Sequence, residues 1–203
     1  MFYEPKNGHG LPRDPFKALV APRPIGWFTT LNDDGSVNLA PYSYFNAVAD
    51  DPPIVFFSSG GAGRFKDSAR NAVERGEFVH NLVTWDLREA MNATSEEVDA
   101  GVDETKLVSL DLAPCELIET PRVAASPASF ECRTIKTVEF EQNGEDGPNT
   151  LVFGEVIGIH IAGGALEDGR FDPEAQKIIA RLGYANYAVA GGTFRMLRPE
   201  LLK

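Results

Sequence analysis

The sequence of 203 residues lacks several features that would assign it to a familiar class. It has no run of about 18 apolar residues, so we expect no membrane-spanning helix. Residues 1–14 do not place a basic stretch before an apolar one, so no signal peptide is predicted. Only two cysteines, Cys115 and Cys132, are present, which is too few for a disulfide framework or a zinc site. The cytoplasm, a reducing compartment, is the simplest expectation.

Basic residues are also scarce, with 19 lysines and arginines against 30 aspartates and glutamates and a net charge of −11. Proteins that bind nucleic acid need a positive surface, so we do not expect nucleic acid as the main partner. A local pair of cations could still hold one phosphate group. The hydrophobic fraction of 43% and the length fit one globular domain over residues 1–203.

Motifs of the common nucleotide-binding and hydrolytic folds are missing too. There is no GxGxxG after the first predicted strand, no GxxxxGK[ST] and no GxSxG. The three histidines (His9, His80 and His160) share no triad or ligand spacing. The last two lie in the middle of predicted strands, where a structural role is favoured. The sequence therefore predicts no catalytic side chain and no metal ligand.

The sequence does contain a series of β-rich segments with few helices between them. Strands are predicted at residues 25–31, 37–45, 51–59, 78–84, 117–124, 129–142, 150–162 and 192–198. Helices are predicted at residues 15–20, 66–76, 85–92, 95–107 and 172–183. Because strands and helices do not alternate as in a parallel α/β protein, an α+β protein built on a small antiparallel β-barrel fits best.

One stretch, FFSSGGAGRFKDSARNA (residues 56–72), combines hydroxyls, glycines and cations at a predicted helix start. The first turn of a helix has N–H groups without intrahelical acceptors, and these bind anions. Arg64 and Lys66 would add positive charge, and Ser58 and Ser59 would add hydroxyls. This composition predicts a phosphate site, although a capped loop between a strand and a helix would explain it without a ligand.

A second stretch, RPIGWFTTLNDDGSVNLAPYSYF (residues 23–45), is rich in aromatic and hydroxyl side chains. It is typical of an aromatic hairpin, and it could equally form the wall of a site for a flat ligand. Pro41 removes an N–H donor from the ladder and could leave neighbouring backbone groups free to face that ligand. A flat hydrogen-bonding ring joined to a phosphate describes flavin mononucleotide (FMN).

The chain resembles the flavin reductase-like family of the FMN-binding split barrel, the flavoredoxin type. The residues that carry the resemblance are Arg23–Ser58, Lys66–Asn71 (KDSARN), Asn92–Pro114, PRVAASPASFECR (121–133) and ARLGYANYAV (180–189). The resemblance implies a mainly β, α+β fold: a six-stranded antiparallel split β-barrel with peripheral helices, working as a homodimer. It also implies an FMN-dependent oxidoreductase that takes hydride from NADH or NADPH and passes electrons to flavin or another acceptor. Some members supply a partner monooxygenase.

The resemblance also assigns cofactor-binding residues. The phosphate and ribityl chain would lie against Ser58, Ser59, Arg64, Lys66, Asp67, Ser68 and Asn71. The isoalloxazine ring would lie against Thr29, Thr30, Ala40, Pro41, Tyr42, Ser43 and Phe45. We expect Asp67 to cap the helix rather than to touch phosphate. The sequence departs from the family pattern where Ser68 replaces the commoner threonine, where Thr105 stands in place of an aromatic residue, and at residues 182–184.

Two other interpretations remain open at this point. A split barrel could bind flavin or haem without turnover. A β-barrel could also serve only as an interaction module, with the aromatic hairpin as a subunit contact. A visible absorption spectrum and an assay of NAD(P)H oxidation distinguish these from a flavin reductase.

Overall fold

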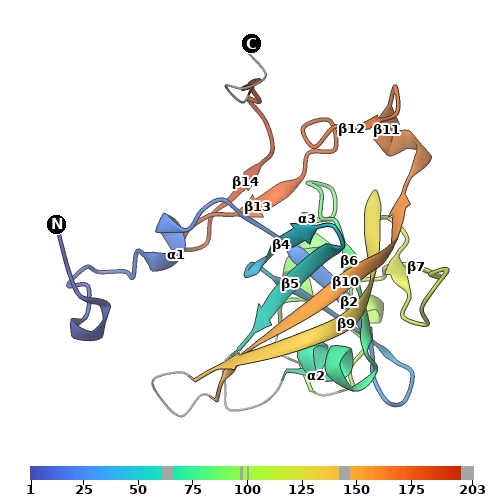
Figure 1. The fold of residues 1–203 in the computed structure, drawn as a ribbon, viewed down its shortest axis with the longest axis horizontal. Helices are drawn as coiled ribbons and strands as arrows, with labels where there is room; N and C mark the ends of the chain where they lie inside the picture. The colour runs from blue at the N-terminus through green and yellow to red at the C-terminus, as the bar shows by residue number, and fades with distance from the viewer. Residues whose placement is uncertain (61–65, 97, 100, 142–146, 198–203) are drawn as a thin grey trace.

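The computed structural model describes residues 1–60, 66–96, 98–99, 101–141 and 147–197 (Figure 1). Among these residues, the largest element is a seven-stranded antiparallel sheet in the order β3-β2-β6-β9-β10-β5-β4. Its strands are β2 (Gly26–Leu31), β3 (Val37–Tyr42), β4 (Phe45–Asp50), β5 (Pro53–Ser59), β6 (Glu77–Asn81), β9 (Ala128–Phe140) and β10 (Asn149–Ile161). No helix in the described part of the chain is long and apolar enough to cross a membrane.

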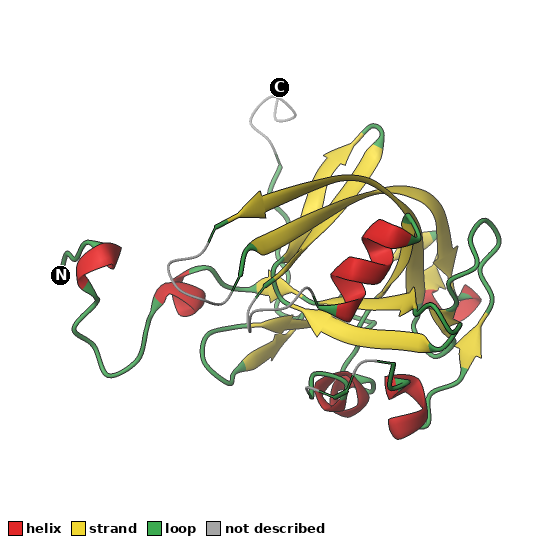
Figure 2. Ribbon diagram, turned by 90° about the horizontal axis from the view of Figure 1, so that it is seen from below, coloured by secondary structure: helices red, strands yellow, loops and turns green. Residues whose placement is uncertain are grey.

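The sheet curls into a split barrel, which confirms the predicted fold class. Strands β3 and β4 are the two outer strands of the sheet, yet only Ser43 and Tyr44 separate them along the chain. Because so short a connection spans at most about 11 Å, the two edges must meet there. The N–H of Ser58 ties this connection to β5 by donating to the carbonyl of Tyr44 at 2.8 Å. Figure 2 shows the long strands curving around the interior.

The sheet has one strand more than the six expected. The sequence analysis merged residues 37–45 into a single strand, whereas the structure ends β3 at Tyr42 and begins β4 at Phe45. Strand β4 then runs back along β5, with Phe45 opposite Phe57. The break places the Ser43–Tyr44 turn at the seam of the barrel.

Aromatic side chains fill the barrel interior. The Phe28 ring stacks on Phe57 with centroids 4.4 Å apart and meets Phe78 edge-on at 5.5 Å. Helix α2 (Asp67–Glu74) packs against β2, β6 and β10, and its Ala69 and Ala72 join the same cluster. Helix α2 therefore covers the barrel and has a fixed position relative to the strands (Figures 1 and 2).

A second apolar cluster lies on the outer face of β2. Trp27 and Leu39 pack there with Met91 of helix α3 (Arg88–Ala93). The indole Nε1 of Trp27 donates to Thr94 Oγ1 at 2.9 Å, just beyond the end of α3. Because β2 is covered on both faces, its residues from Gly26 to Thr30 are all buried rather than alternately buried and exposed.

Short elements surround the barrel. They are η1 (Pro5–Asn7), α1 (Phe16–Leu19), β1 (Arg23–Pro24), α4 (Glu104–Leu107), β7 (Leu112–Ala113), β8 (Arg122–Val123), η2 (Gly163–Ala165), β11 (Leu166–Glu167), β12 (Arg170–Phe171), β13 (Ile179–Arg181) and β14 (Tyr187–Val189). Strands β1, β13 and β14 form a small sheet of their own. The N-terminal segment extends away from the barrel (Figure 1).

The prediction of a helix over residues 172–183 was wrong. Residues 179–181 form β13, which pairs with both β1 and β14. The side chain of Ile179 is buried in the outer cluster, so packing and long-range pairing override the local helical spacing. The predicted strand over residues 192–198 was wrong as well, because residues 192–197 carry no strand and β14 is the last strand among the described residues, which end at 197.

Two further predicted elements are much shorter in the structure. Only Glu104–Leu107 is helical within the described part of the predicted helix 95–107, and Gly101 has a φ of +84°, a left-handed conformation that breaks a helix. Only Arg122–Val123 is a strand within the predicted strand 117–124, because the preceding backbone turns to bond side chains of the barrel, as the N–H of Leu117 does with Glu131.

Candidate functional site

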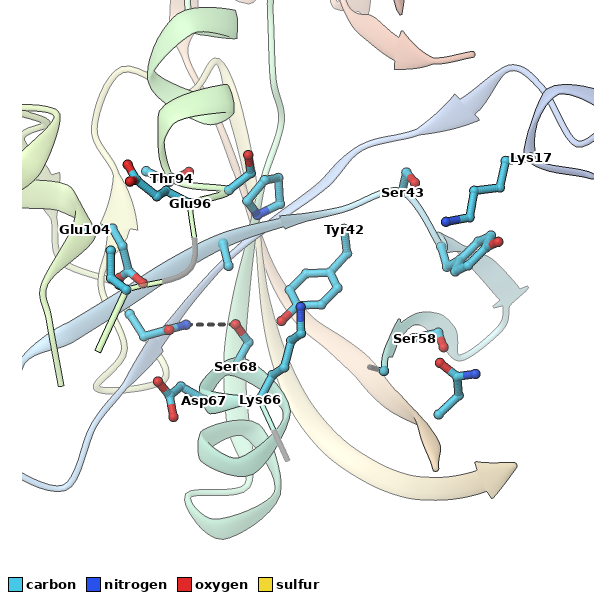
Figure 3. Close-up of a pocket in the computed structure, with 18 residues that line it drawn as sticks. Lys17, Tyr42, Ser43, Ser58, Lys66, Asp67, Ser68, Thr94, Glu96 and Glu104 are labelled. Carbon is cyan, nitrogen blue, oxygen red and sulfur yellow. Dashed lines mark hydrogen bonds between the residues drawn. The ribbon is translucent and has the colours of Figure 1, made fainter. Parts of the chain in front are cut away.

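A cavity of about 630 Å³ opens at the seam of the barrel, where the end of β3, the end of β5 and the start of α2 converge (Figure 3). The segment between α3 and α4 forms its remaining wall. The lining residues are Lys17, Asn38, Ala40, Pro41, Tyr42, Ser43, Tyr44, Ser58, Gly60, Lys66, Asp67, Ser68, Thr94, Ser95, Glu96, Val98, Glu104 and Asn149. This volume is within the range of about 300–1,000 Å³ that is typical of small-molecule sites.

The start of helix α2 supplies one end of the cavity. Lys66 occupies the N-cap position, and its side chain rises beside Tyr42 in Figure 3. Asp67, the first helical residue, makes no side-chain cap and instead pairs with Arg70 (Oδ1 to Nη1, 2.8 Å). The prediction that Asp67 caps the helix was therefore wrong, because an acid at this position reaches the next turn more easily than its own N–H groups. Its charge still complements the helix dipole.

Ser68 joins α2 to β3 through a buried polar network. Asn38 Nδ2 donates to Ser68 Oγ at 2.8 Å and to Thr30 Oγ1 at 3.2 Å. Asn71 Nδ2 donates to the same Thr30 hydroxyl at 3.2 Å and to Asn32 Oδ1 at 2.8 Å. The network fixes the helix start against the strand that forms the other wall of the cavity.

Tyr42 lies between the two ends of the cavity. Burial raises the pKa of its phenol, although the facing hydroxyls of Ser68 and Ser59 oppose that shift. The phenol is therefore neutral at physiological pH and available as a hydrogen-bond donor. Pro41 and Ser43, its neighbours in sequence, line the same wall.

Glu104 is a lining residue that the sequence analysis did not assign to the site. Its Oε2 accepts the N–H of Leu39 at 2.9 Å, so helix α4 caps the outer edge of β3. Burial raises the pKa of the Glu104 carboxyl, opposed by that hydrogen bond. The preceding Asp103 caps α4 by accepting the N–H of Thr105 at 3.1 Å. The stretch GVDET (residues 101–105) was the only trace of this site residue in the sequence. Its packing against β3 could not be inferred from the local sequence.

The structure brings most of the predicted site residues to this cavity. Those that line it are Ala40, Pro41, Tyr42, Ser43, Ser58, Lys66, Asp67 and Ser68. Thr29, Thr30, Ser59 and Asn71 are buried and are not among the lining residues, and Phe45 is half-buried. Arg64 lies outside the described residues.

Some of these buried residues have clear structural partners. Thr29 Oγ1 donates to the carbonyl of Pro121 at 2.6 Å. The ring of Phe45 stacks on His80 with centroids 4.5 Å apart. These contacts position the walls and do not require a ligand. Lys17, Thr94, Ser95 and Glu96, by contrast, line the cavity although the sequence analysis assigned none of them to the site.

A second polar cluster lies elsewhere on the barrel. Glu131 Oε1 accepts from His160 Nε2 at 2.6 Å and from the N–H of Glu116 at 2.8 Å. The ligand atoms of Cys115, Glu131 and His160 lie within 4.8 Å of one another. Both cysteines are free, and burial raises the pKa of the Cys115 thiol to about 12. These hydrogen bonds satisfy the buried carboxylate of Glu131 and anchor the loop at residues 116–117 to β9.

Comparison with known proteins assigns the family. Residues 19–191 match the family model "Flavin reductase like domain". A protein of Deinococcus radiodurans is 35% identical over 191 residues, which cover 89% of this chain and 82% of the relative. The chain belongs to the flavin reductase-like family, and its class is that of flavin-related oxidoreductases.

Two solved structures share both fold and sequence with the chain. Nitrilotriacetate monooxygenase component B from Bacillus cereus is 32% identical, with a TM-score of 0.88 over 97% of this chain and 98% of that one. The 2-nitrobenzoate 2-nitroreductase of Pseudomonas fluorescens is 29% identical, with a TM-score of 0.81 over 93% of this chain and 90% of that one.

Proposed function

We propose that the chain binds FMN in the cavity at the barrel seam and works as an NAD(P)H-dependent flavin reductase. The observation that carries this proposal is the convergence of two unlike walls on one cavity. Lys66 and Ser68 meet it from the start of α2, and the segment from Pro41 to Ser43 meets it from the end of β3.

The residues present fit this cofactor. The first-turn N–H groups of α2, the Ser68 hydroxyl and the Lys66 ammonium group offer donors suited to a phosphate. Of the three acids that line the cavity, Asp67 pairs with Arg70, Glu104 accepts the N–H of Leu39, and Glu96 is exposed to solvent. At the other end, the stiff Pro41 backbone suits a flat ring with hydrogen-bonding edges, and the neutral Tyr42 phenol lies between that ring and the phosphate end.

Bound FMN would supply the redox chemistry, accepting hydride from a reduced nicotinamide and passing electrons to a flavin or another acceptor. The chain's own residues would hold the phosphate, orient the ring against β3 and limit the access of water. No acid or base is needed for hydride transfer, which agrees with the absence of a predicted catalytic side chain. We also propose a homodimer of single-domain subunits in the cytoplasm, able to supply a partner monooxygenase.

Titration with FMN tests the proposal directly. We expect wild-type protein to bind FMN and become yellow, and NADH or NADPH to bleach the bound flavin under anaerobic conditions. The variant Lys66→Ala should raise the Kd for FMN roughly ten- to a hundredfold, because it removes a charge-assisted contact. Lys136→Ala, an exposed lysine on β9, is the matched control and should leave the Kd unchanged.

Each alternative gives a different result. Wild-type affinity in Lys66→Ala would show that the phosphate lies elsewhere. Binding of FMN without bleaching would indicate a flavin module without turnover, and binding of haemin in place of FMN would indicate a haem module. A colourless protein whose melting temperature FMN does not raise would favour an interaction protein.

A further inference from the structure

A second cavity, of about 420 Å³, adjoins the first and shares five lining residues with it, which are Lys17, Pro41, Tyr42, Ser43 and Ser95. Its charged lining consists of three cations (Lys17, Arg23 and Arg181) and one acid, Asp14. This local excess of positive charge contrasts with the net charge of −11 of the whole chain. A cavity with this charge attracts anions.

The two arginines face each other across a strand pair. Arg23 of β1 and Arg181 of β13 are direct antiparallel partners. Like charges placed directly opposite each other destabilise a sheet. Neither arginine forms an ion pair with an acid within the described ranges. The pair therefore costs stability in the absence of an anion.

Arg23 is held in place by main-chain groups rather than by acids. It is only 6% exposed, its Nη1 donates to the carbonyls of Lys17 and Val20, and its Nη2 donates to that of Leu182 at 2.9 Å. Its buried Nε has no acceptor among the described residues. A guanidinium group remains charged at any physiological pH, and a buried charge is stabilised by a counter-charge. The carbonyls fix the position of Arg23 but supply no negative charge.

Tyrosine rings complete the cavity around Arg181. Its guanidinium carbon lies 4.5 Å from the centroid of the Tyr187 ring, and its Nη2 donates to the carbonyl of Tyr184. Both tyrosines line the cavity with Tyr42. Aromatic faces beside cations suit a ligand that combines a planar ring with an anionic group.

We propose that Arg23, Arg181 and Lys17 form an oxyanion subsite for the second substrate. The ligand class is a planar ring that carries a phosphate or carboxylate group, with the ring directed toward the shared wall at Tyr42 and Ser43. This inference rests on the proposed function, because the adjoining cavity must hold the cofactor for the subsite to serve electron transfer. The phosphate of a nicotinamide nucleotide and the carboxylate of an aromatic acceptor share this chemistry, and the experiment distinguishes them.

Equilibrium binding to FMN-loaded protein tests the subsite with two probes, NADP⁺ and benzoate, by titration calorimetry. Arg181→Gln and Lys17→Gln should each raise the Kd for at least one probe by about tenfold, since each removes a charged contact. Arg23 is left intact because it holds three main-chain carbonyls. Arg170→Gln is the control. It also removes one positive charge, but Arg170 is an exposed residue of β12 that does not line the cavity.

The outcomes separate the possibilities. Weaker NADP⁺ binding alone assigns the subsite to the nicotinamide nucleotide, weaker benzoate binding alone assigns it to a carboxylate acceptor, and weakening of both supports a common anion site. The subsite is overturned if both variants bind both probes as Arg170→Gln does, or if wild-type protein binds neither probe. A separate FMN titration of the apoprotein tests the cofactor. If the apoprotein does not bind FMN, the NADP⁺ and benzoate titrations are repeated on the apoprotein, and probe binding that still depends on Arg181 would reject the proposed function alone.

Discussion

Asn38 Nδ2 donates to Ser68 Oγ at 2.8 Å, a hydrogen bond between residues 30 positions apart that ties β3 to the first turn of α2. Both side chains are buried, at 4% and 1% exposure. Because both residues line the seam cavity, this bond fixes the wall formed by β3 against the wall formed by α2 where the two meet. The stability of the fold and the shape of the site are linked at this point.

Ser68→Ala should therefore lower the free energy of unfolding by about 1–2 kcal/mol, since it leaves a buried N–H of Asn38 without its acceptor. Urea unfolding should show a lower midpoint with an unchanged slope. Ser68→Thr keeps the hydroxyl and should recover most of the loss. Ser95→Ala, at an exposed position, serves as the control. Equal stability of the Ser68→Ala and Ser95→Ala variants would show that the bond contributes nothing.

Glu131→Gln should destabilise the protein at neutral pH by about 1–3 kcal/mol. The side chain is 1% exposed, and its two oxygens accept the N–H groups of Glu116 and Leu117, each at 2.8 Å. An amide can satisfy only one of these donors through its oxygen. Glu116→Gln, which changes an exposed carboxylate in the same loop, should have little effect.

Glu131→Gln should also change how the free energy of unfolding depends on pH in the acid range. Burial alone would raise the pKa of Glu131, but the Glu116 N–H, His160 and the Leu117 N–H together hold it below its ordinary value of 4.5. A lowered pKa stabilises the fold above pH 4.5, and this contribution disappears as the pH falls through the lower folded value. The stability difference between wild type and Glu131→Gln should therefore shrink below that pH, and a constant difference would contradict the assignment.

His80→Phe should remove a different acid-sensitive component. Burial lowers the pKa of His80 to about 4 from its ordinary 6.5, although the contact of its Nε2 with the Ile25 carbonyl opposes the shift. Its ring packs against Phe28, Phe45 and Phe130, none of which can stabilise a charge by ion pairing. Because the unfolded chain takes up a proton first, wild-type stability should fall from pH 6.5 to about 4.

Unfolding measured at steps across this interval checks the expectation. The His80→Phe variant should show a flatter profile than wild type, whereas His9→Gln, a change near the N-terminus, should reproduce the wild-type slope. Identical slopes for wild type and His80→Phe would mean that another group titrates in this range. Most of this interval lies above pH 4.5, where the contribution of Glu131 begins to fall, so the two contributions overlap only at its lower end.

The barrel strands could be predicted because their signal is local. Strand β5 alternates buried and less buried positions from Val55 to Ser59, and β10 does the same from Thr150 to Val156. Both segments are rich in β-branched and aromatic residues, and this composition is visible in the sequence without knowledge of the partner strand. The predicted helix 66–76 was also correct in its essentials, since α2 spans Asp67–Glu74 and Gly76 adopts the left-handed φ of +72° that follows many helices.

The errors have a common physical cause, which is pairing between segments far apart in the chain. Residues 172–183 have helical spacing, yet residues 179–181 form the strand β13 because they pair with β1. That partner lies more than 150 positions earlier in the chain, so the local sequence does not report it. Glu104 and Lys17 reach the cavity only because α4 packs on β3 and because α1 packs on the turn at Gly183. No local pattern reports such packing. The resemblance supplied eight of the residues that line the seam cavity. It did not indicate that Arg23 and Arg181 lie together in the adjoining cavity.

Gly183 determines where α1 lies, and with it Lys17. A Cβ added at Gly183 would come within 2.3 Å of Ala18 Cβ and 2.7 Å of Ala18 Cα. The second of these is a backbone atom, so no side-chain rotation can relieve the clash and α1 must shift. Neither apolar cluster of the barrel includes these residues, so the barrel itself should keep its stability.

Gly183→Ala should therefore weaken binding of NADP⁺ or benzoate severalfold, by displacing Lys17, while the unfolding midpoint changes little. Gly164→Ala is the matched control, because a Cβ there meets nothing within 4 Å. Adding Ala18→Gly to Gly183→Ala removes the closer of the two clashes and leaves the one with the backbone of residue 18, so probe binding should recover in part. Full wild-type binding in Gly183→Ala would show that the position of α1 does not control the subsite, whereas partial recovery in the double variant is expected only if α1 carries Lys17 into place.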